Sequence, residues 1–363
     1  MINKMKGFGE NNNNNFRKFY ISKKDDNSYV KNKLILARNY LNTGRINLAE
    51  VIYSQLIKEG INSYDLFFSY ALLSRNKSNL KFAKYLLNQS ISKYPSMVDH
   101  YILLAEIFRL EKNFPKAIEL LLISRKINPR NSNTFYNLAL LYRALDSKEN
   151  SLININQAIK LDAHNYVYKL LKADILKDEN KLKESREILD ELYSNKNIND
   201  KKDILLMLST VERLDSNLFQ AEKILLKIIR LYPSFNQAYL NLSDLYFEKK
   251  LLKKAKEIIL EGIKNNSNIP EMYVNLGFIS RSLGEINESK KHFLKALSMD
   301  KNLYMCYLSL STFYDFSENP IELEHLFKVP VNKLNSEEPD RENIKINMVV
   351  IIKKPIVKSL LQI

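Results

Sequence analysis

Apolar positions along most of the chain follow helical spacing, and the pattern restarts every 34 residues. Two apolar helix faces fit within each interval, which predicts a helix–turn–helix unit. The unit from Tyr166 is 36 residues long, with its extra residues near 195–200. The units begin at Val30, Tyr64, Val98, Ser132, Tyr166, Lys202, Asn236 and Pro270, and a half unit begins at Tyr304.

Two positions of the unit, counted from its first residue, hold only small side chains. Because antiparallel helices approach closely only where the crossing side chains are small, we expect these positions to mark the contact between the two helices. Position 8 is Ala37, Ala71, Ala105, Ala139, Ala173, Ser209, Ser243, Gly277 and Ser311. Position 20 is Ala49, Ala83, Ala117, Ser151, Ser185, Ala221, Ala255 and Ser289.

Larger side chains surround the small contact, as a packed helical pair requires. Position 24 is aromatic or aliphatic in every unit, from Tyr53 to Phe293, and position 11 holds aromatic residues such as Tyr142. In three units a proline at position 32 would end the second helix. These prolines are Pro95, Pro129 and Pro233.

The unit 132–165 resembles the tetratricopeptide repeat most closely, through Phe135, Leu138, Ala139, Tyr142 and Ala158. Pentatricopeptide repeats run to 35 residues, so the 34-residue length favours the tetratricopeptide family. The resemblance implies an all-α fold, a right-handed α–α superhelix of about eight and a half repeats over residues 30–319. It also implies that the first helices line a concave groove. One unit cannot bury its apolar face alone, so the repeats are expected to stack.

Two segments lie outside the repeats. Residues 1–29 contain a run of five asparagines and scattered charges, and we interpret them as a disordered, weakly basic tail. Residues 320–363 form an irregular tail that ends in an apolar stretch, which we interpret as a truncated linker or a capping segment. Residues 308–346 are similar to the joint between repeats and catalytic domain in cyanobacterial proteins that join tetratricopeptide repeats to a sulfotransferase domain. The opening MKGFGE (5–10) is similar to the start of repeat proteins of marine picocyanobacteria.

Composition argues against most enzyme folds. The protein has seven glycines in 363 residues and contains no glycine-rich phosphate-binding motif. One cysteine, Cys306, excludes a multi-cysteine zinc site, and the four histidines do not share a helix face. We therefore predict a non-enzymatic protein without a cofactor or bound metal. No run of 18 apolar residues and no signal peptide are present, which predicts a cytoplasmic protein without a membrane span.

Position 12 of the first helix is the principal candidate for partner binding. Six of its eight residues are cationic, and stacked repeats would arrange them as a ladder able to hold carboxylate, sulfate or phosphate. The alternative is a structural role near the helix C-terminus, with Arg109 paired to Glu106 and Lys177 to Asp174 on the same helix. The six residues, which we call the cation ladder, are Arg75, Arg109, Arg143, Lys177, Arg213 and Arg281.

Position 6 of the first helix adds a second set of candidates. Asn137, Asn241 and Asn275 resemble the asparagine ladder with which the repeats of O-linked N-acetylglucosamine transferase hold a peptide backbone. Only three of eight units keep this residue, so a generic helix start is the competing interpretation.

Charge leaves three functional hypotheses. The first 131 residues carry 22 Lys and Arg against 10 Asp and Glu, so much of the net charge of +15 lies there. The first hypothesis is an interaction scaffold whose groove binds a protein or peptide, with acidic segments favoured by the cation ladder. The second is the substrate-presenting arm of a truncated or split sulfotransferase or glycosyltransferase. RNA binding through the basic N-terminal third is the weakest, because few aromatic residues line the groove. The oligomeric state stays open.

Overall fold

The computed structural model describes residues 27–311 and residue 313. All regular structure in this part of the protein is α-helical, which confirms the all-α prediction. The protein forms two compact units: unit 1, Met1–Glu179, and unit 2, Asn180–Ile363. The tail predicted at 320–363 and most of the tail predicted at 1–29 lie outside the described residues, but a helix already begins at Asn27.

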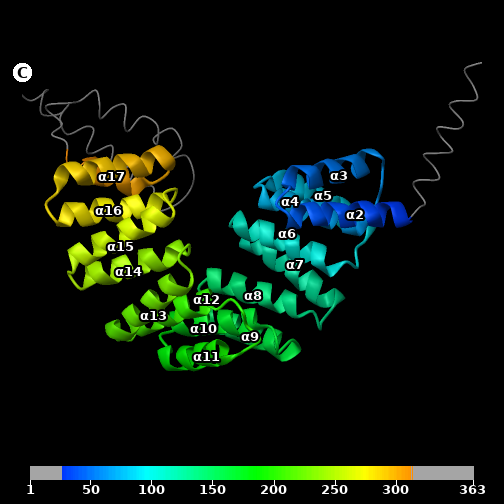
Figure 1. Cartoon of the computed structure of the whole chain (residues 1–363). Coiled ribbons are helices and arrows are strands. Elements are labelled where there is room, and N and C mark those ends of the chain that lie inside the picture. Colours follow the sequence, from blue (N-terminus) through cyan, green and yellow to red (C-terminus); the bar gives the residue numbers. More distant parts are fainter. Residues whose placement is uncertain (1–26, 312, 314–363) are drawn as a thin grey trace, which may run out of the picture. The chain divides into compact units, whose positions relative to one another are not determined.

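Unit 1 consists of helices that pack as antiparallel pairs, α2 with α3, α4 with α5, α6 with α7 and α8 with α9 (Figure 1). Each pair is one repeat, and α10 follows α9. The helices are α2 (Asn27–Asn42), α3 (Ile46–Lys58), α4 (Tyr64–Asn76), α5 (Leu80–Lys93), α6 (Val98–Leu110), α7 (Phe114–Ile127), α8 (Ser132–Ala144), α9 (Lys148–Leu161) and α10 (Tyr166–Asp178).

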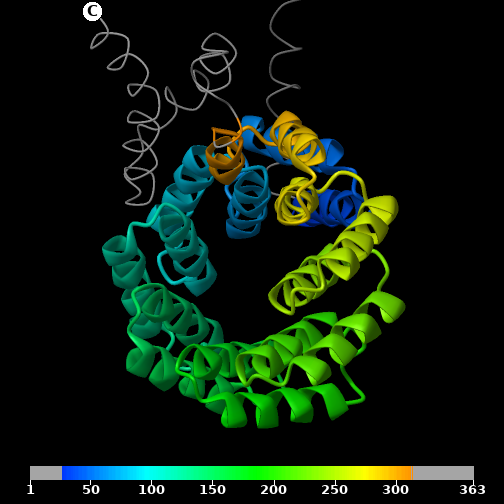
Figure 2. The same ribbon diagram turned by 90° about the vertical axis from the view of Figure 1, so that its left-hand side faces the viewer.

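Unit 2 repeats the arrangement with α12 and α13, α14 and α15, and α16 and α17; Figure 2 gives a second view of these pairs. The helices are α11 (Leu182–Ser194), α12 (Lys202–Leu214), α13 (Leu218–Leu231), α14 (Asn236–Glu248), α15 (Leu252–Asn265), α16 (Pro270–Ser282), α17 (Ile286–Met299) and α18 (Tyr304–Ser311).

Small side chains at the helix crossing permit close packing and add hydrogen bonds between the paired helices. Ser151 at position 20 is fully buried, and its Oγ donates to the carbonyl of Ala139 at position 8, at 2.8 Å. Ser289 donates to Gly277 in the same way, at 2.8 Å. A Cβ on Gly277 would lie 2.6 Å from the Phe293 ring, so this crossing in unit 2 requires glycine.

The turn between paired helices uses the same left-handed residue at position 15 in each repeat. Gly44 and Gly284 have φ values of 72° and 81°. Six further repeats place a non-glycine residue there, for example Lys112 with φ 59°. An L-residue pays only about 1 kcal/mol for this conformation. Within residues 27–311, six of the eight such turns are accordingly made without glycine.

First helices of neighbouring repeats also touch one another. α4 contacts α6 and α6 contacts α8 in unit 1, and α14 contacts α16 in unit 2. Side chains at positions 2, 5, 6, 9 and 12 of these helices therefore meet on a shared face, and this face carries the site residues.

Candidate functional site

The cation ladder lies in the last turn of the first helices, and carboxylates hold most of its members. In unit 1 the Arg75 guanidinium contacts Glu106 of α6 at 2.5 Å. Arg143 of α8 contacts Asp174 at 2.5 Å and Asp178 at 2.6 Å, both on α10. Each acid comes from the next repeat, 31 or 35 residues further along the sequence. These ion pairs therefore join neighbouring first helices.

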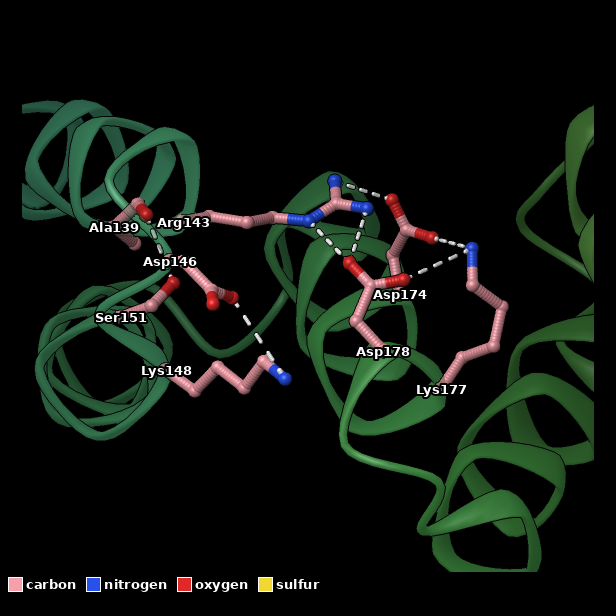
Figure 3. A network of polar contacts seen from close by, with 8 residues as sticks. All are labelled: Ala139, Arg143, Asp146, Lys148, Ser151, Asp174, Lys177 and Asp178. Carbon is pink, nitrogen blue, oxygen red and sulfur yellow. Dashed lines mark hydrogen bonds and ion pairs between the residues drawn. The ribbon is translucent and has the colours of Figure 1, made fainter.

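Lys177 belongs to the same network as Arg143 (Figure 3). Its Nζ contacts Asp174 at 2.5 Å and Asp178 at 3.5 Å, which confirms the predicted pair with Asp174. The two aspartates lie between the guanidinium and the ammonium group. Two positive and two negative charges thus form a compact, neutral cluster, which favours a structural role for Arg143 and Lys177.

In unit 2 the ladder residues have two different environments. Arg213 of α12 donates to Glu248 of α14, again 35 residues further along. Arg281 at the end of α16 lies over the ring of Phe313, with its Cζ 5.0 Å from the ring centroid. An aromatic face attracts a guanidinium through its quadrupole. Arg213 therefore forms an ion pair, whereas Arg281 forms a cation–π contact.

Arg109 of α6 differs from these residues because it has no ion-pair partner among the residues that the structure describes. The suggested pair with Glu106 is wrong, since that carboxylate binds Arg75 instead. The residues 31 and 35 positions after Arg109 are Leu140 and Ala144, neither of which is acidic. The Nε of Arg109 is buried and lacks a hydrogen-bond partner within residues 27–311 and 313. The absence of an acid from these two positions is visible in the sequence, but only when neighbouring repeats are compared with each other.

A cavity of about 400 Å³ lies beside Arg109, where α4, α6 and α8 meet. Its apolar lining includes Leu72 of α4, Ile102 of α6 and Leu140 of α8. Phe68 of α4 and Tyr136 of α8 add aromatic surface. Mixed apolar and polar lining of this kind suits a ligand whose side chains fill the cavity while polar groups fix its orientation.

Charges in the cavity are separated along α6. Arg109 lies in the last turn of this helix, and Asp99 lies exposed in its first turn. Glu106 also lines the cavity, but it is paired with Arg75. Burial raises the pKa of the Tyr136 phenol, and the positive charge of Arg109 opposes this rise. The cavity is therefore positive near Arg109 and negative near Asp99.

Two of the predicted asparagines have unlike surroundings. Asn137 lines the cavity of unit 1, and its Nδ2 donates to the carbonyl of Asn133 on the same helix at 2.9 Å. Asn241 in unit 2 accepts a hydrogen bond from Gln237 Nε2 at 2.9 Å. Of the two, Asn137 lies in the cavity beside a ladder residue, and its Oδ1 can accept from a ligand backbone.

The third asparagine belongs to a smaller cavity of about 210 Å³ between α14 and α16. Asn275 Nδ2 donates to Asp244 Oδ1 at 2.9 Å, and Phe247 and Phe278 line the same cavity. Part of Asp244 is exposed to solvent. Partial desolvation of its carboxylate by the surrounding protein raises its pKa, and the positive charge of Arg213 opposes this rise. This cavity thus presents a carboxylate among aromatic rings.

Groups that usually carry catalysis are not assembled in the described residues. No cluster of three or more His, Cys, Asp or Glu that could hold a metal ion occurs there. Cys306 is fully buried, and burial raises the pKa of its thiol to about 12. A protonated, inaccessible thiol is a poor nucleophile. Among the described helices, none has the length and apolar character needed to cross a membrane.

Three segments match the sequence profile of the tetratricopeptide repeat family: residues 132–165, 237–269 and 270–303. Tetratricopeptide repeats are thus present in this protein. The first matched segment contains the helices α8 and α9, and α8 forms one wall of the larger cavity. One wall of the cavity of unit 1 is therefore the first helix of a matched tetratricopeptide repeat.

Solved structures share the helical fold. A tetratricopeptide repeat protein from Parabacteroides merdae has a TM-score of 0.54 at 19% identity, covering 67% of this chain and 95% of that protein. The APC/C hetero-tetramer Cut9–Hcn1 gives a TM-score of 0.52 at 13% identity, covering 82% of this chain and 58% of the matched one. These likenesses establish the fold.

A curated human protein is also similar. The Protein O-mannosyl-transferase TMTC3 of Homo sapiens is 28% identical over 192 residues, which is 52% of this chain. The match covers 19% of the length of the human protein. The similarity therefore concerns only a small part of that transferase.

Proposed function

We propose that the protein is a non-catalytic interaction scaffold that binds an extended peptide or protein segment on the first helices of unit 1. Tetratricopeptide repeats bind proteins and peptides as a class, and the repeat fold is generally non-catalytic. The observation that carries the proposal is the cavity between α4, α6 and α8, which combines apolar walls with an Arg109 that no described acid pairs.

Ion pairing on the basic N-terminal third favours a protein ligand over RNA. Lys77 contacts Glu50 at 2.5 Å, and Lys84 contacts Glu111 at 2.7 Å. RNA binding needs unpaired cations that can release counterions from phosphates, together with aromatic side chains on which bases stack. Carboxylates that already neutralise part of the charge weaken both attraction and salt dependence.

A substitution that fills the cavity tests the scaffold proposal. Random 12-residue peptides would be selected on the full-length protein, and the affinity of a selected peptide would be measured by fluorescence anisotropy. Leu140→Trp places a bulky indole ring in the cavity and should weaken binding by about 10-fold or more, because the ligand side chain loses its space.

The matched control lies in the same repeat. Ile153 on α9 is 58% exposed and lies outside the cavity lining, so Ile153→Trp should leave affinity unchanged. Circular dichroism and thermal unfolding would verify that both variants keep the fold. Failure to select any peptide, or equal affinity of the two variants, contradicts the proposal.

A second candidate function is that of a substrate-presenting arm for a glycosyltransferase, and it rests on the similarity to the human O-mannosyl-transferase. Such an arm would hold acceptor segments rich in Ser and Thr in an extended form. The same selection separates the two functions: enrichment of Ser- and Thr-rich peptides supports the arm, whereas peptides without this enrichment argue against it. A sulfotransferase arm would instead hold segments that carry the free hydroxyl group to be sulfated.

A further inference from the structure

Three of the six residues of the cation ladder follow one positional rule: their cation at position 12 pairs with an acid at position 9 or 13 of the next repeat. Lys177 instead pairs with acids of its own helix, and Arg281 contacts Phe313. Arg75 uses position 9, Arg213 uses position 13, and Arg143 uses both. The rule identifies the acid that a structural ladder residue needs, and so also identifies a residue that lacks one.

Arg109 breaks this rule although its neighbours on both sides obey it. Positions 9 and 13 of the next repeat are Leu140 and Ala144, and Glu106 on its own helix is occupied by Arg75. A guanidinium has five N–H donors and no acceptor, and a buried donor without a partner is costly. The Nε of Arg75 is also buried without a partner, but the Arg75 guanidinium contacts Glu106, whereas no acid of the described residues contacts the Arg109 guanidinium. Arg109 therefore lacks a counter-charge that a ligand can supply.

We infer that Arg109 binds a carboxylate of the ligand, so that unit 1 selects segments with an acidic side chain or a free C-terminus at this point. This inference rests on the proposed scaffold function. A carboxylate matches the planar fork of the guanidinium, and the apolar walls at Leu72, Ile102 and Leu140 strengthen the contact by excluding water.

The neighbouring acids favour a carboxylate over a phosphate. Asp99 and Glu106 line the same cavity, and a dianionic phosphate would meet stronger repulsion from them than a singly charged carboxylate. Asp99 also favours a particular position for a positive charge on the ligand. It lies ten residues before Arg109 on α6, about 15 Å along the helix, which an extended peptide spans with about four to five residues. A basic group at that distance from the carboxylate would face Asp99.

The test uses four sets of random nine-residue peptides on the full-length protein. The sets combine a fixed central Glu or Gln with a free or amidated C-terminus. Each set would be applied to the wild type and to Arg109→Gln, Leu140→Glu and Leu140→Gln. Leu140→Glu supplies the missing acid at position 9, so it should close Arg109 into an ion pair like that of Arg75 with Glu106. Leu140→Gln is its neutral control.

The wild type should retain a carboxylate-bearing set at least about 10-fold better than the doubly neutral set. Leu140→Gln adds no charge but weakens one apolar wall, so it should keep the same preference at a smaller ratio. Whether central Glu or the free C-terminus gives the enrichment identifies the source of the carboxylate. The preference should disappear in Arg109→Gln and in Leu140→Glu. Because these two variants remove the interaction in different ways, a folding defect in one leaves the other informative.

Two failures are distinguishable. If the doubly neutral set binds the wild type as well as the others, or if Arg109→Gln keeps the preference, the carboxylate inference is overturned and the scaffold function stands. If no set binds the wild type, both proposals are overturned. A central phosphoserine that outcompetes central Glu would also contradict the carboxylate assignment.

Discussion

The cavities of the two units lie on equivalent first helices but present side chains of opposite charge. In unit 1 the cavity between α4, α6 and α8 presents Arg109, which no acid of the described residues neutralises. In unit 2 the smaller cavity between α14 and α16 presents the carboxylate of Asp244, and position 12 of α14 is Phe247. Substitutions at two or three positions of the first helices are therefore enough to change the charge that the cavity presents to a ligand.

The comparison shows that a charged position in a repeat protein has meaning only together with its neighbour. Arg75 and Arg109 occupy the same repeat position, yet within the described residues one is paired with an acid and the other is not. The difference arises in the following repeat, where Glu106 stands at position 9 for Arg75 and Leu140 for Arg109. Repeating charge alone thus does not identify a binding surface.

The largest difference in stability between the units should appear at the helix crossing. Gly277→Ala in unit 2 places a Cβ 2.6 Å from the Phe293 ring and should destabilise α16 and α17 by about 1–3 kcal/mol through overpacking. Unit 1 has Ala139 and Ile155 at the same repeat positions, both fully buried. The measurement is urea unfolding, with hydrogen exchange resolved by unit.

Adding Phe293→Ile to Gly277→Ala reproduces the Ala and Ile pair of unit 1. The double variant should recover part of the stability that Gly277→Ala loses. Non-additivity in this double-mutant cycle is the expected sign of contact. Additive effects, or a neutral Gly277→Ala, would show that the crossing in unit 2 has spare space and that the glycine is not required.

Ion pairs should give the next largest contrast. Asp174→Asn in unit 1 removes a carboxylate shared by Arg143 and Lys177 and should cost about 1 kcal/mol. Glu248→Gln in unit 2 breaks a pair with Arg213 in which the Glu248 side chain is 45% exposed, and should cost only about 0.3 kcal/mol. Urea denaturation at low and high salt would measure both. A larger loss for Glu248→Gln would reverse the comparison.

Low pH should destabilise unit 1 through protonation of His100, and this effect should be smaller than that of the ion pairs. This histidine is 2% exposed, and burial lowers its pKa, although the carbonyl of Tyr64 and the carboxylates of Asp99 and Asp65 oppose the shift. The unfolded state therefore binds the proton more readily than the folded one. Stability is retained above the unfolded pKa of about 6.5 and is lost as the pH falls towards the folded pKa.

The variant His100→Gln removes this titration. Between about pH 7.5 and pH 5.5 it should lose less stability than the wild type, and the difference should appear in hydrogen exchange of α4 and α6. In unit 2 Asp244 should have the opposite effect on stability as the pH falls. Its pKa is raised in the folded state, so protonation favours the folded form. Equal pH dependence of wild type and His100→Gln would exclude His100 as the cause.

The fold was largely predictable from the sequence because it depends on contacts inside one repeat. Small residues at positions 8 and 20 must meet across 12 residues of sequence, as Ala139 and Ser151 do, so their spacing is directly visible. The turn at position 15 was less visible. Glycine marks it at Gly44, but residues such as Lys112 adopt the same left-handed conformation against their preference.

The site was predictable only in part because its charges are decided between repeats. The sequence identified Arg109 and Asn137, and both line the cavity. It also proposed Arg75 and Arg143, whose partners Glu106 and Asp174 lie 31 residues away. Reading one helix at a time could not assign these pairs, whereas aligning position 12 with positions 9 and 13 of the following repeat would have done so.

A crystal structure of the full-length protein with a selected carboxylate-bearing peptide would test the account most directly. The account predicts that the peptide lies in the cavity between α4, α6 and α8, with a carboxylate oxygen within about 3 Å of the Arg109 guanidinium. The pairs of Arg75 with Glu106 and of Arg143 with Asp174 should persist. A peptide bound elsewhere, or one whose carboxylate displaces Glu106 from Arg75 and leaves Arg109 unpaired, would contradict it.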